Sequence, residues 1–207
     1  MPDPQLPGPD DSTTAPVHGG KIALRDRLRT ARSRLGPAGV ATAAAAIAEQ
    51  VLAVPEVRRA ASVAAYVGVG TEPGTGVLLD RLLAAGKRVL LPVVLPGLDL
   101  DWAAYTGPDC LARAAMGLLE PTGPRLGVAA IATPEVILVP GMGVSPTGYR
   151  IGQGGGCYDR ALARVPADTF TCILLYDDEV GLPVPVEPHD IPVRAAVSPA
   201  GLTRLGR

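Results

Sequence analysis

The sequence is short of several residue types, and each shortage excludes a class of protein. Its 19 basic and 20 acidic side chains nearly cancel, leaving a formal net charge of −1. A chain without excess positive charge lacks the electrostatic footprint of a protein that binds duplex nucleic acid or an anionic membrane. No charge-free apolar run reaches the roughly 18 residues of a membrane-spanning helix. We therefore expect neither nucleic acid nor a membrane as a partner.

Cysteine and histidine are equally scarce. The three cysteines, Cys110, Cys157 and Cys172, are odd in number and lack C-x-x-C spacing, and the chain has two histidines. These counts exclude a disulfide framework and a Cys-rich or His-rich zinc centre. The start of the chain is acidic and proline-rich, unlike a secretory signal. We expect a cytoplasmic monomer that acts on small molecules.

Lysine is rare in this chain, which has two lysines, Lys21 and Lys87, and 17 arginines. A lysine kept under such a bias indicates a place where a compact point charge is needed instead of a planar fork. At 100° per residue, Lys21, Arg25 and Arg32 fall within about 40° of one another, beside the apolar stripe of a helix expected over residues 21–35. They could reach a ligand from there, or they could form an ordinary basic helix edge.

The order of apolar segments predicts the fold. Residues 1–19 hold almost nothing to bury, so we expect a disordered tail there and a single α/β domain over residues 20–207. Short β-branched runs alternate with helical segments, which predicts a three-layer, Rossmann-like α/β fold with a mostly parallel central sheet flanked by helices. The expected strands cover residues 61–67, 88–95, 136–139 and 170–176, and the expected helices cover residues 21–35, 41–54, 77–85 and 158–165. Residues 98–105 alternate like a half-exposed strand that could run antiparallel.

The most informative segment is residues 136–164, which read as a buried strand, a glycine-rich loop and a helix. Glycines in such a loop remove the side chains that would keep phosphate oxygens away from backbone N–H groups, and the helix start adds a positive end. Arg150 can add a bidentate clamp on an anion. The pattern is neither a Walker loop nor G-x-G-x-x-G, and a flexible surface turn is the alternative.

Acidic side chains follow this loop and recur near the end of the chain. Asp159 could hold Mg²⁺ against bound phosphates, or could simply favour the first turn of a helix. Asp190 offers a second carboxylate, although Glu187, His189 and Asp190 taken alone are more typical of a solvated loop. A solvated turn after a strand is our interpretation of the acidic run Asp177, Asp178 and Glu179.

Several motifs occur in the order found in one known family. LVPGMGVSPTGYRIGQGGGCYDR at residues 138–160 is similar to that family's strand and its R-L-G-x-G-G-G-Y-Y-D-R block. The other matches are K-x-x-x-R and R-x-x-L within residues 21–35, V-A-A-Y-x-x-x-x-x-E at 63–72, LLPVV at 90–94, GLLEP at 117–121 and E-x-H-D at 187–190. On these motifs the chain resembles the 5-formyltetrahydrofolate cyclo-ligase family, also called 5,10-methenyltetrahydrofolate synthetase, from about residue 21 to residue 197.

The resemblance implies an enzyme that uses MgATP to convert 5-formyltetrahydrofolate into 5,10-methenyltetrahydrofolate, ADP and phosphate. It implies catalytic roles for Lys21, Arg150 and Tyr158. ATP would be bound by Lys21, Arg25, Arg150, Gly152, Gln153, Gly154, Gly155, Gly156, Cys157 and Tyr158, and Mg²⁺ by Asp159 and Asp190. The folate would be bound by Val67, Glu72, Trp102, Gln153, Gly155 and Tyr158. In this set Glu72 would accept paired hydrogen bonds from the pterin.

The chain departs from the family at Cys157, which stands where the family usually has the first tyrosine of Tyr-Tyr-Asp. Losing that ring weakens folate recognition more than phosphate chemistry. Two alternatives therefore stay open. One is a nucleotide-binding or folate-binding protein without turnover on the same scaffold. The other is an isomerase or transferase of sugar phosphates, which the architecture and a phosphate loop alone would permit.

Overall fold

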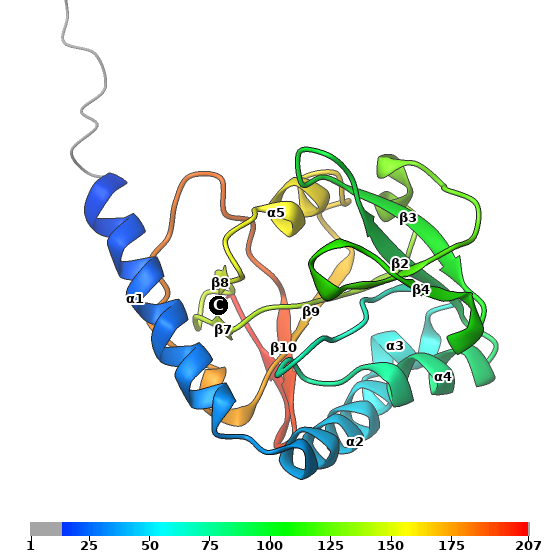
Figure 1. Cartoon of the computed structure of the whole chain (residues 1–207), viewed down its shortest axis with the longest axis horizontal. Coiled ribbons are helices and arrows are strands. Elements are labelled where there is room, and N and C mark those ends of the chain that lie inside the picture. Colours follow the sequence, from blue (N-terminus) through cyan, green and yellow to red (C-terminus); the bar gives the residue numbers. More distant parts are fainter. Residues whose placement is uncertain (1–13, 207) are drawn as a thin grey trace, which may run out of the picture.

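The computed structural model describes residues 14–206, and its centre is a seven-stranded sheet (Figure 1). The strand order is β11-β10-β9-β6-β1-β2-β3, with parallel inner strands and antiparallel strands β3 and β11 at the edges. The strands of this sheet are β1 (Ser62–Ala64), β2 (Arg88–Val94), β3 (Leu100–Tyr105), β6 (Val136–Val139), β9 (Phe170–Leu174), β10 (Ala195–Ser198) and β11 (Gly201–Arg204). The predicted mostly parallel sheet is confirmed.

Helices cover both faces of the sheet. On one face lie α2 (Pro37–Ala53), α3 (Pro55–Arg59) and α4 (Gly76–Ala84), and on the other lie α5 (Cys157–Leu162) and the short 3₁₀ helix η4 (Val128–Ala132). Along β6, Val136 and Leu138 belong to the apolar cluster under α2, whereas Ile137 and Val139 belong to the cluster under α5. A strand buried on both faces needs such an uninterrupted apolar run. The three-layer prediction is therefore confirmed.

Helix α1 (Thr14–Ser33) stands apart from these layers (Figure 1). Its Leu24 and Leu28 form a separate small cluster with Met142, Ile151 and Val184. The helix thereby packs on the short hairpin of β7 (Gly143–Val144) and β8 (Arg150–Ile151), from which the glycine-rich loop leaves. No single helix among the described residues is long and apolar enough to cross a membrane.

The start of α1 corrects one prediction. Residues 1–13 of the expected tail lie outside the described residues, but residues 14–19 belong to the helix. Pro16 is compatible with this earlier start, because the first turn of a helix has no use for the missing N–H group. At the other end, Leu35 lies beyond the helix and is exposed, since Gly36 and Pro37 begin the next element.

The remaining elements lie in the segments that were hardest to interpret. The strand expected over residues 98–105 is β3, which pairs antiparallel with β2. Strands β10 and β11 were not predicted, because the alanine-rich sequence of β10 has little of the β-branched character of a buried strand. The other elements that were not predicted are β4 (Leu111–Arg113), β5 (Leu119–Pro121), η2 (Pro108–Cys110), η3 (Ala115–Gly117) and η5 (Asp177–Glu179), together with α3, η4, β7 and β8.

Candidate active site

The glycine-rich loop joins β8 to α5 and is held from both sides by arginines. Arg25 on α1 donates from Nε to the Gly152 carbonyl at 2.9 Å, and Arg160 on α5 donates from Nη2 to the Gly155 carbonyl at 2.7 Å. Gly154 has a φ of +106°, and a β-carbon there would lie 3.5 Å from the Arg25 guanidinium. A side chain at Gly154 would therefore both strain the backbone and crowd the arginine. Two arginines thus hold the carbonyls of the loop in place.

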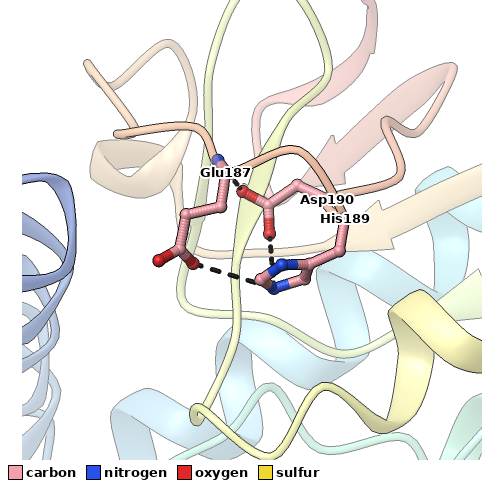
Figure 2. A group of neighbouring side chains, drawn as sticks. All are labelled: Glu187, His189 and Asp190. Atoms are coloured by element: carbon pink, nitrogen blue, oxygen red, sulfur yellow. Dashed lines mark hydrogen bonds and ion pairs between the residues drawn. The ribbon is translucent and has the colours of Figure 1, made fainter. Parts of the chain in front are cut away.

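Lys21 on α1 contacts a second loop. This loop contains Glu187, His189 and Asp190 (Figure 2). The Nζ of Lys21 lies 2.7 Å from Oε2 of Glu187 and 2.6 Å from Oδ2 of Asp190, and Lys21 is only 4% exposed. The hydrogen bond from Lys21 lowers the pKa of Glu187 against a smaller opposing effect of burial. Figure 2 also shows the His189 ring between the two carboxylates, with Nε2 at 3.7 Å from each. These side chains form a charged cluster, so the interpretation of a solvated loop is wrong for Glu187 and Asp190.

Arg150 and Asp159 form the neighbouring cluster. Arg150 Nη2 lies 3.0 Å from Asp159 Oδ1, and Arg150 Nη1 donates to the Ile191 carbonyl at 2.6 Å. The same Asp159 oxygen accepts a hydrogen bond from the Ile191 amide at 3.1 Å. Because Ile191 directly follows Asp190, this closed set of bonds places the two predicted metal carboxylates on adjoining segments. The structure thus brings Lys21, Arg150, Asp159 and Asp190 together.

Glu72 approaches the glycine-rich loop from the opposite side, on the loop between β1 and α4. Its Oε2 accepts a hydrogen bond from the Val69 amide at 3.2 Å, and its carboxylate also interacts with the Gln153 side chain. Gln153 in turn accepts a hydrogen bond from Arg29 at 3.1 Å. Burial raises the pKa of Glu72, whereas the Val69 amide, the charge of Arg32 and the Gln153 hydrogen bond act in the lowering direction. Two expected folate residues, Glu72 and Gln153, are therefore in contact.

Two tyrosines near Glu72 have hydroxyls that the described part of the chain does not satisfy. The hydroxyls of Tyr66 and Tyr158 are both buried, and neither has a hydrogen-bond partner there. Burial, followed by the charge of Glu72, raises the pKa of each tyrosine above its ordinary value. Both therefore stay protonated and can donate a hydrogen bond.

Arg32, the third cation on the inner side of α1, lies deeper. It is 2% exposed and forms a bidentate pair with Glu179, with Nε to Oε1 at 2.6 Å and Nη2 to Oε2 at 2.8 Å. Its Nη2 also donates to the Gly141 carbonyl at 2.7 Å. The interpretation of residues 177–179 as a solvated turn is wrong for Glu179, although Asp177 and Asp178 are exposed. A buried arginine on a helix needs a carboxylate partner, and this was the signal by which Glu179 could have been found.

Some expected site residues lie elsewhere or contribute less. Trp102 on β3 is fully buried in the core cluster under α5, so its ring has no exposed face to offer a folate. Trp102 was expected as a flat partner for the pterin because it lies near the segments that match the family, but both sides of β3 are covered at this point. Val67 follows β1, is half-buried and packs against the cluster under α2. Cys157 begins α5 beside the loop and is also half-buried.

The fold and the site define an α/β protein in which cations and carboxylates from several elements meet beside a glycine-rich loop. Residues 17–199 match the 5-formyltetrahydrofolate cyclo-ligase family. The chain belongs to this family, and the resemblance predicted from the sequence is confirmed. Its members are ATP-dependent ligases, so the predicted enzyme class is confirmed as well.

Individual relatives support the same family. The 5-formyltetrahydrofolate cyclo-ligase of Mycolicibacterium smegmatis is 42% identical over 144 residues, which cover 67% of this chain and 73% of the relative. The Escherichia coli K12 protein of the same name is 31% identical over 156 residues, covering 74% of this chain and 86% of the relative. The solved structure of Aquifex aeolicus 5,10-methenyltetrahydrofolate synthetase has a TM-score of 0.77 and 28% identity, covering 90% of this chain and 93% of that chain.

Proposed function

We propose that the protein converts 5-formyltetrahydrofolate into 5,10-methenyltetrahydrofolate with the consumption of MgATP and the release of ADP and phosphate. One observation carries the proposal. Lys21, Arg150, Asp159 and Asp190 converge beside the glycine-rich loop, and each of them lies in a motif of the family. The substrates would be ATP and the formylated folate.

The chemistry requires two displacements. The formyl oxygen attacks the γ-phosphorus of ATP, and ADP leaves. A second folate nitrogen then attacks the activated formyl carbon, loses its proton and expels phosphate, which carries away the former formyl oxygen. The protein must bring a weak oxygen nucleophile in line with the phosphate and neutralise charge, which is positioning and electrostatics.

The residues present fit a magnesium ion. Asp159 and Asp190 supply carboxylate oxygens, the ligands that Mg²⁺ prefers in proteins, and Glu187 lies close to Asp190. When bound, Mg²⁺ would neutralise negative charge on the phosphates. His189 completes a compact group of possible ligand atoms with Glu187 and Asp190, but imidazole suits transition metals better than magnesium. We therefore assign the magnesium role to Asp159 and Asp190.

The same carboxylates now bind the cations that we expect to contact phosphate. Lys21 lies between Glu187 and Asp190, and Arg150 lies against Asp159. Phosphate oxygens would compete with these carboxylates for Lys21 and Arg150, and a metal would compete with the cations for the carboxylates. The residues would thus exchange one set of partners for another, with the buried charges paired before and after binding.

On the folate side, Glu72 would accept hydrogen bonds from the amino and ring N–H groups of the pterin. The buried hydroxyl of Tyr158 is available to the same ligand, and Gln153 connects Glu72 to the glycine-rich loop. This connection supports a shared position for the two substrates, because Gln153 lies in the loop that would hold the nucleotide.

The test mixes the pure protein with 5-formyltetrahydrofolate and MgATP. We expect the near-ultraviolet absorbance of the methenyl product to rise, and phosphate to be released only when the folate is present. Measurable ATP and folate binding without any product, even at high protein concentration, would instead establish a binding protein without turnover. The half-buried Cys157 in place of the family's tyrosine is the observation that keeps this second candidate in view.

A further inference from the structure

Arg32 has more hydrogen-bonding capacity than a structural ion pair uses. Its Nε and Nη2 bind Glu179, but the buried Nη1 has no hydrogen-bond partner among residues 14–206. A buried ion pair is weak evidence for stability, because well-packed apolar side chains often replace one at no cost. The pair therefore calls for an explanation beyond the anchoring of α1.

A chain of direct contacts runs from Arg32 to the loop that carries Glu72. The Arg32 guanidinium lies over the Tyr176 ring, 5.4 Å from its centroid, and Glu179 accepts a hydrogen bond from the Tyr176 amide at 3.0 Å. The Tyr176 hydroxyl donates to the Thr71 carbonyl at 3.1 Å. Thr71 directly precedes Glu72, so the position of this loop depends on the Arg32 pair through one aromatic ring.

We propose that Arg32 is a positioning residue for folate recognition, which holds the Glu72 loop through Tyr176 and keeps a positive charge facing the Glu72 carboxylate. The proposal rests on the proposed function, in which Glu72 binds the pterin.

The charged and titratable groups that act on Glu72 support this electrostatic role of Arg32. Burial raises the pKa of Glu72, and Arg32 is the full positive charge that opposes this rise. The other titratable groups that face Glu72 are hydroxyls with raised pKa values, which stay neutral, and they come from Tyr66, Tyr158 and Tyr176. Gln153, with Arg29 behind it, contributes a hydrogen bond. An ionised Glu72 offers both oxygens as acceptors to the pterin donors, whereas in the protonated form one oxygen carries a donor proton. Arg32 therefore favours the form that we expect to bind.

The experiment compares two variants of the same ion pair, one that removes its positive charge and one that removes its negative charge. The affinity for 5-formyltetrahydrofolate is measured by calorimetry from pH 5 to pH 8 in Arg32→Met and in Glu179→Gln. In Arg32→Met the acid limb of binding should move to higher pH by about one unit, a roughly tenfold loss of affinity at acidic pH. In Glu179→Gln it should move to lower pH, because the charge of Arg32 is no longer neutralised. A purely structural role would shift both variants in the same direction or in neither, and that result would overturn the proposal.

Two further variants keep the proposal testable if Arg32→Met or Glu179→Gln does not fold. Tyr176→Phe keeps the ion pair and removes only the hydrogen bond to Thr71, so it should weaken folate binding severalfold at every pH. Arg164→Met breaks a comparable bidentate pair with Asp99 outside the site, and it should leave the folate profile unchanged. Unaltered folate binding in Tyr176→Phe would overturn the positioning role. A wild-type protein that binds no folate at any pH would instead overturn the proposed function itself.

Discussion

The two sides of the candidate site satisfy their polar groups in different ways. On the side of Lys21 and Arg150, each cation is already paired with a carboxylate at 3.0 Å or less. On the side of Glu72, the hydroxyls of Tyr66 and Tyr158 are buried without partners among the described residues. Binding on the first side would require Lys21 and Arg150 to exchange partners, so we expect it to depend on several charges. On the second side the Glu72 carboxylate acts together with the tyrosine hydroxyls, so we expect binding there to depend on one charge and on hydrogen bonding.

The largest expected effect is that of Asp159→Asn on the charged side. The substitution removes a carboxylate that we assign to Mg²⁺ and leaves Arg150 without its ionic partner. We expect turnover with MgATP to fall by about a hundredfold or more, with folate binding nearly unchanged. Steady-state kinetics and calorimetry on the same preparation measure the two quantities. Equal losses in both would contradict the metal role.

Lys21→Arg should have the next largest effect. The arginine keeps the charge, but its planar fork cannot replace a point charge held between Glu187 and Asp190 at 2.6–2.7 Å. We expect kcat/KM for ATP to fall about tenfold, or roughly 1.4 kcal/mol, with the KM for folate little altered. A fully active variant would return Lys21 to an ordinary basic helix edge.

Lys21→Gln tests the side of Lys21 and Arg150 by metal binding instead of by enzyme activity. Because Lys21 neutralises Glu187 and Asp190, its removal should let these carboxylates bind Mn²⁺ severalfold more tightly in the absence of nucleotide. Electron paramagnetic resonance of free Mn²⁺ during titration measures this affinity. Lys87→Gln is the matched control, since Lys87 donates to backbone carbonyls of Arg58 and Ala60, away from the site. An unchanged Mn²⁺ affinity in Lys21→Gln would show that these carboxylates are not a cation site.

Cys157→Tyr addresses the side of Glu72. Restoring the aromatic ring that the family usually has should strengthen folate binding by about threefold to tenfold, in line with 0.5–1.5 kcal/mol for an aromatic contact. The affinity for ATP should change less. Calorimetric titration with each ligand makes the comparison, and a variant that gains ATP affinity but no folate affinity would place this residue on the other side of the site.

The smallest effect concerns stability in acid. The hydrogen bond from Lys21 lowers the pKa of Glu187 below the ordinary value of a glutamate. A carboxylate with a lowered pKa in the folded state contributes stability above its unfolded pKa, and this contribution is lost as the pH falls through the folded pKa. Wild type should therefore exceed Glu187→Gln in stability at pH 7 by more than at pH 3. Urea unfolding at both pH values measures the difference, and an equal difference at both would contradict the ion pair.

The sequence alone predicted the strands whose pattern of apolar and polar residues is typical of a strand. The apolar run of β6 predicted a buried strand of a parallel sheet, and the alternating residues of β3 predicted a strand that could run antiparallel; both are present. Strand β10 escaped prediction because alanines have no strong preference for a strand, so pairing with β9 and β11 decides its conformation. Local pattern cannot show such long-range pairing.

The candidate site was predictable where its residues lie close together in the sequence. The loop from Arg150 to Asp159 could be interpreted directly, whereas the acidic run at residues 177–179 could not. Glu179 differs from Asp177 and Asp178 only in the buried arginine that meets it from α1, far away in the chain. The burial of Trp102 could not be predicted either, because the elements that cover its ring are distant in the sequence and the local sequence does not reveal their position.

Helix α1 has one more consequence. Lys21 at one end of its inner side contacts the acidic loop, and Arg32 near the other end contacts Glu179. At about 1.5 Å per residue, the stretch between them spans about 16 Å. The length of this stretch of helix therefore matches the distance between the acidic loop and Glu179. One alanine inserted between Arg25 and Arg32 would turn one end by about 100° relative to the other. A change in the length of this helix would therefore disturb both contacts at once, whereas a substitution of one of its side chains leaves the spacing unchanged.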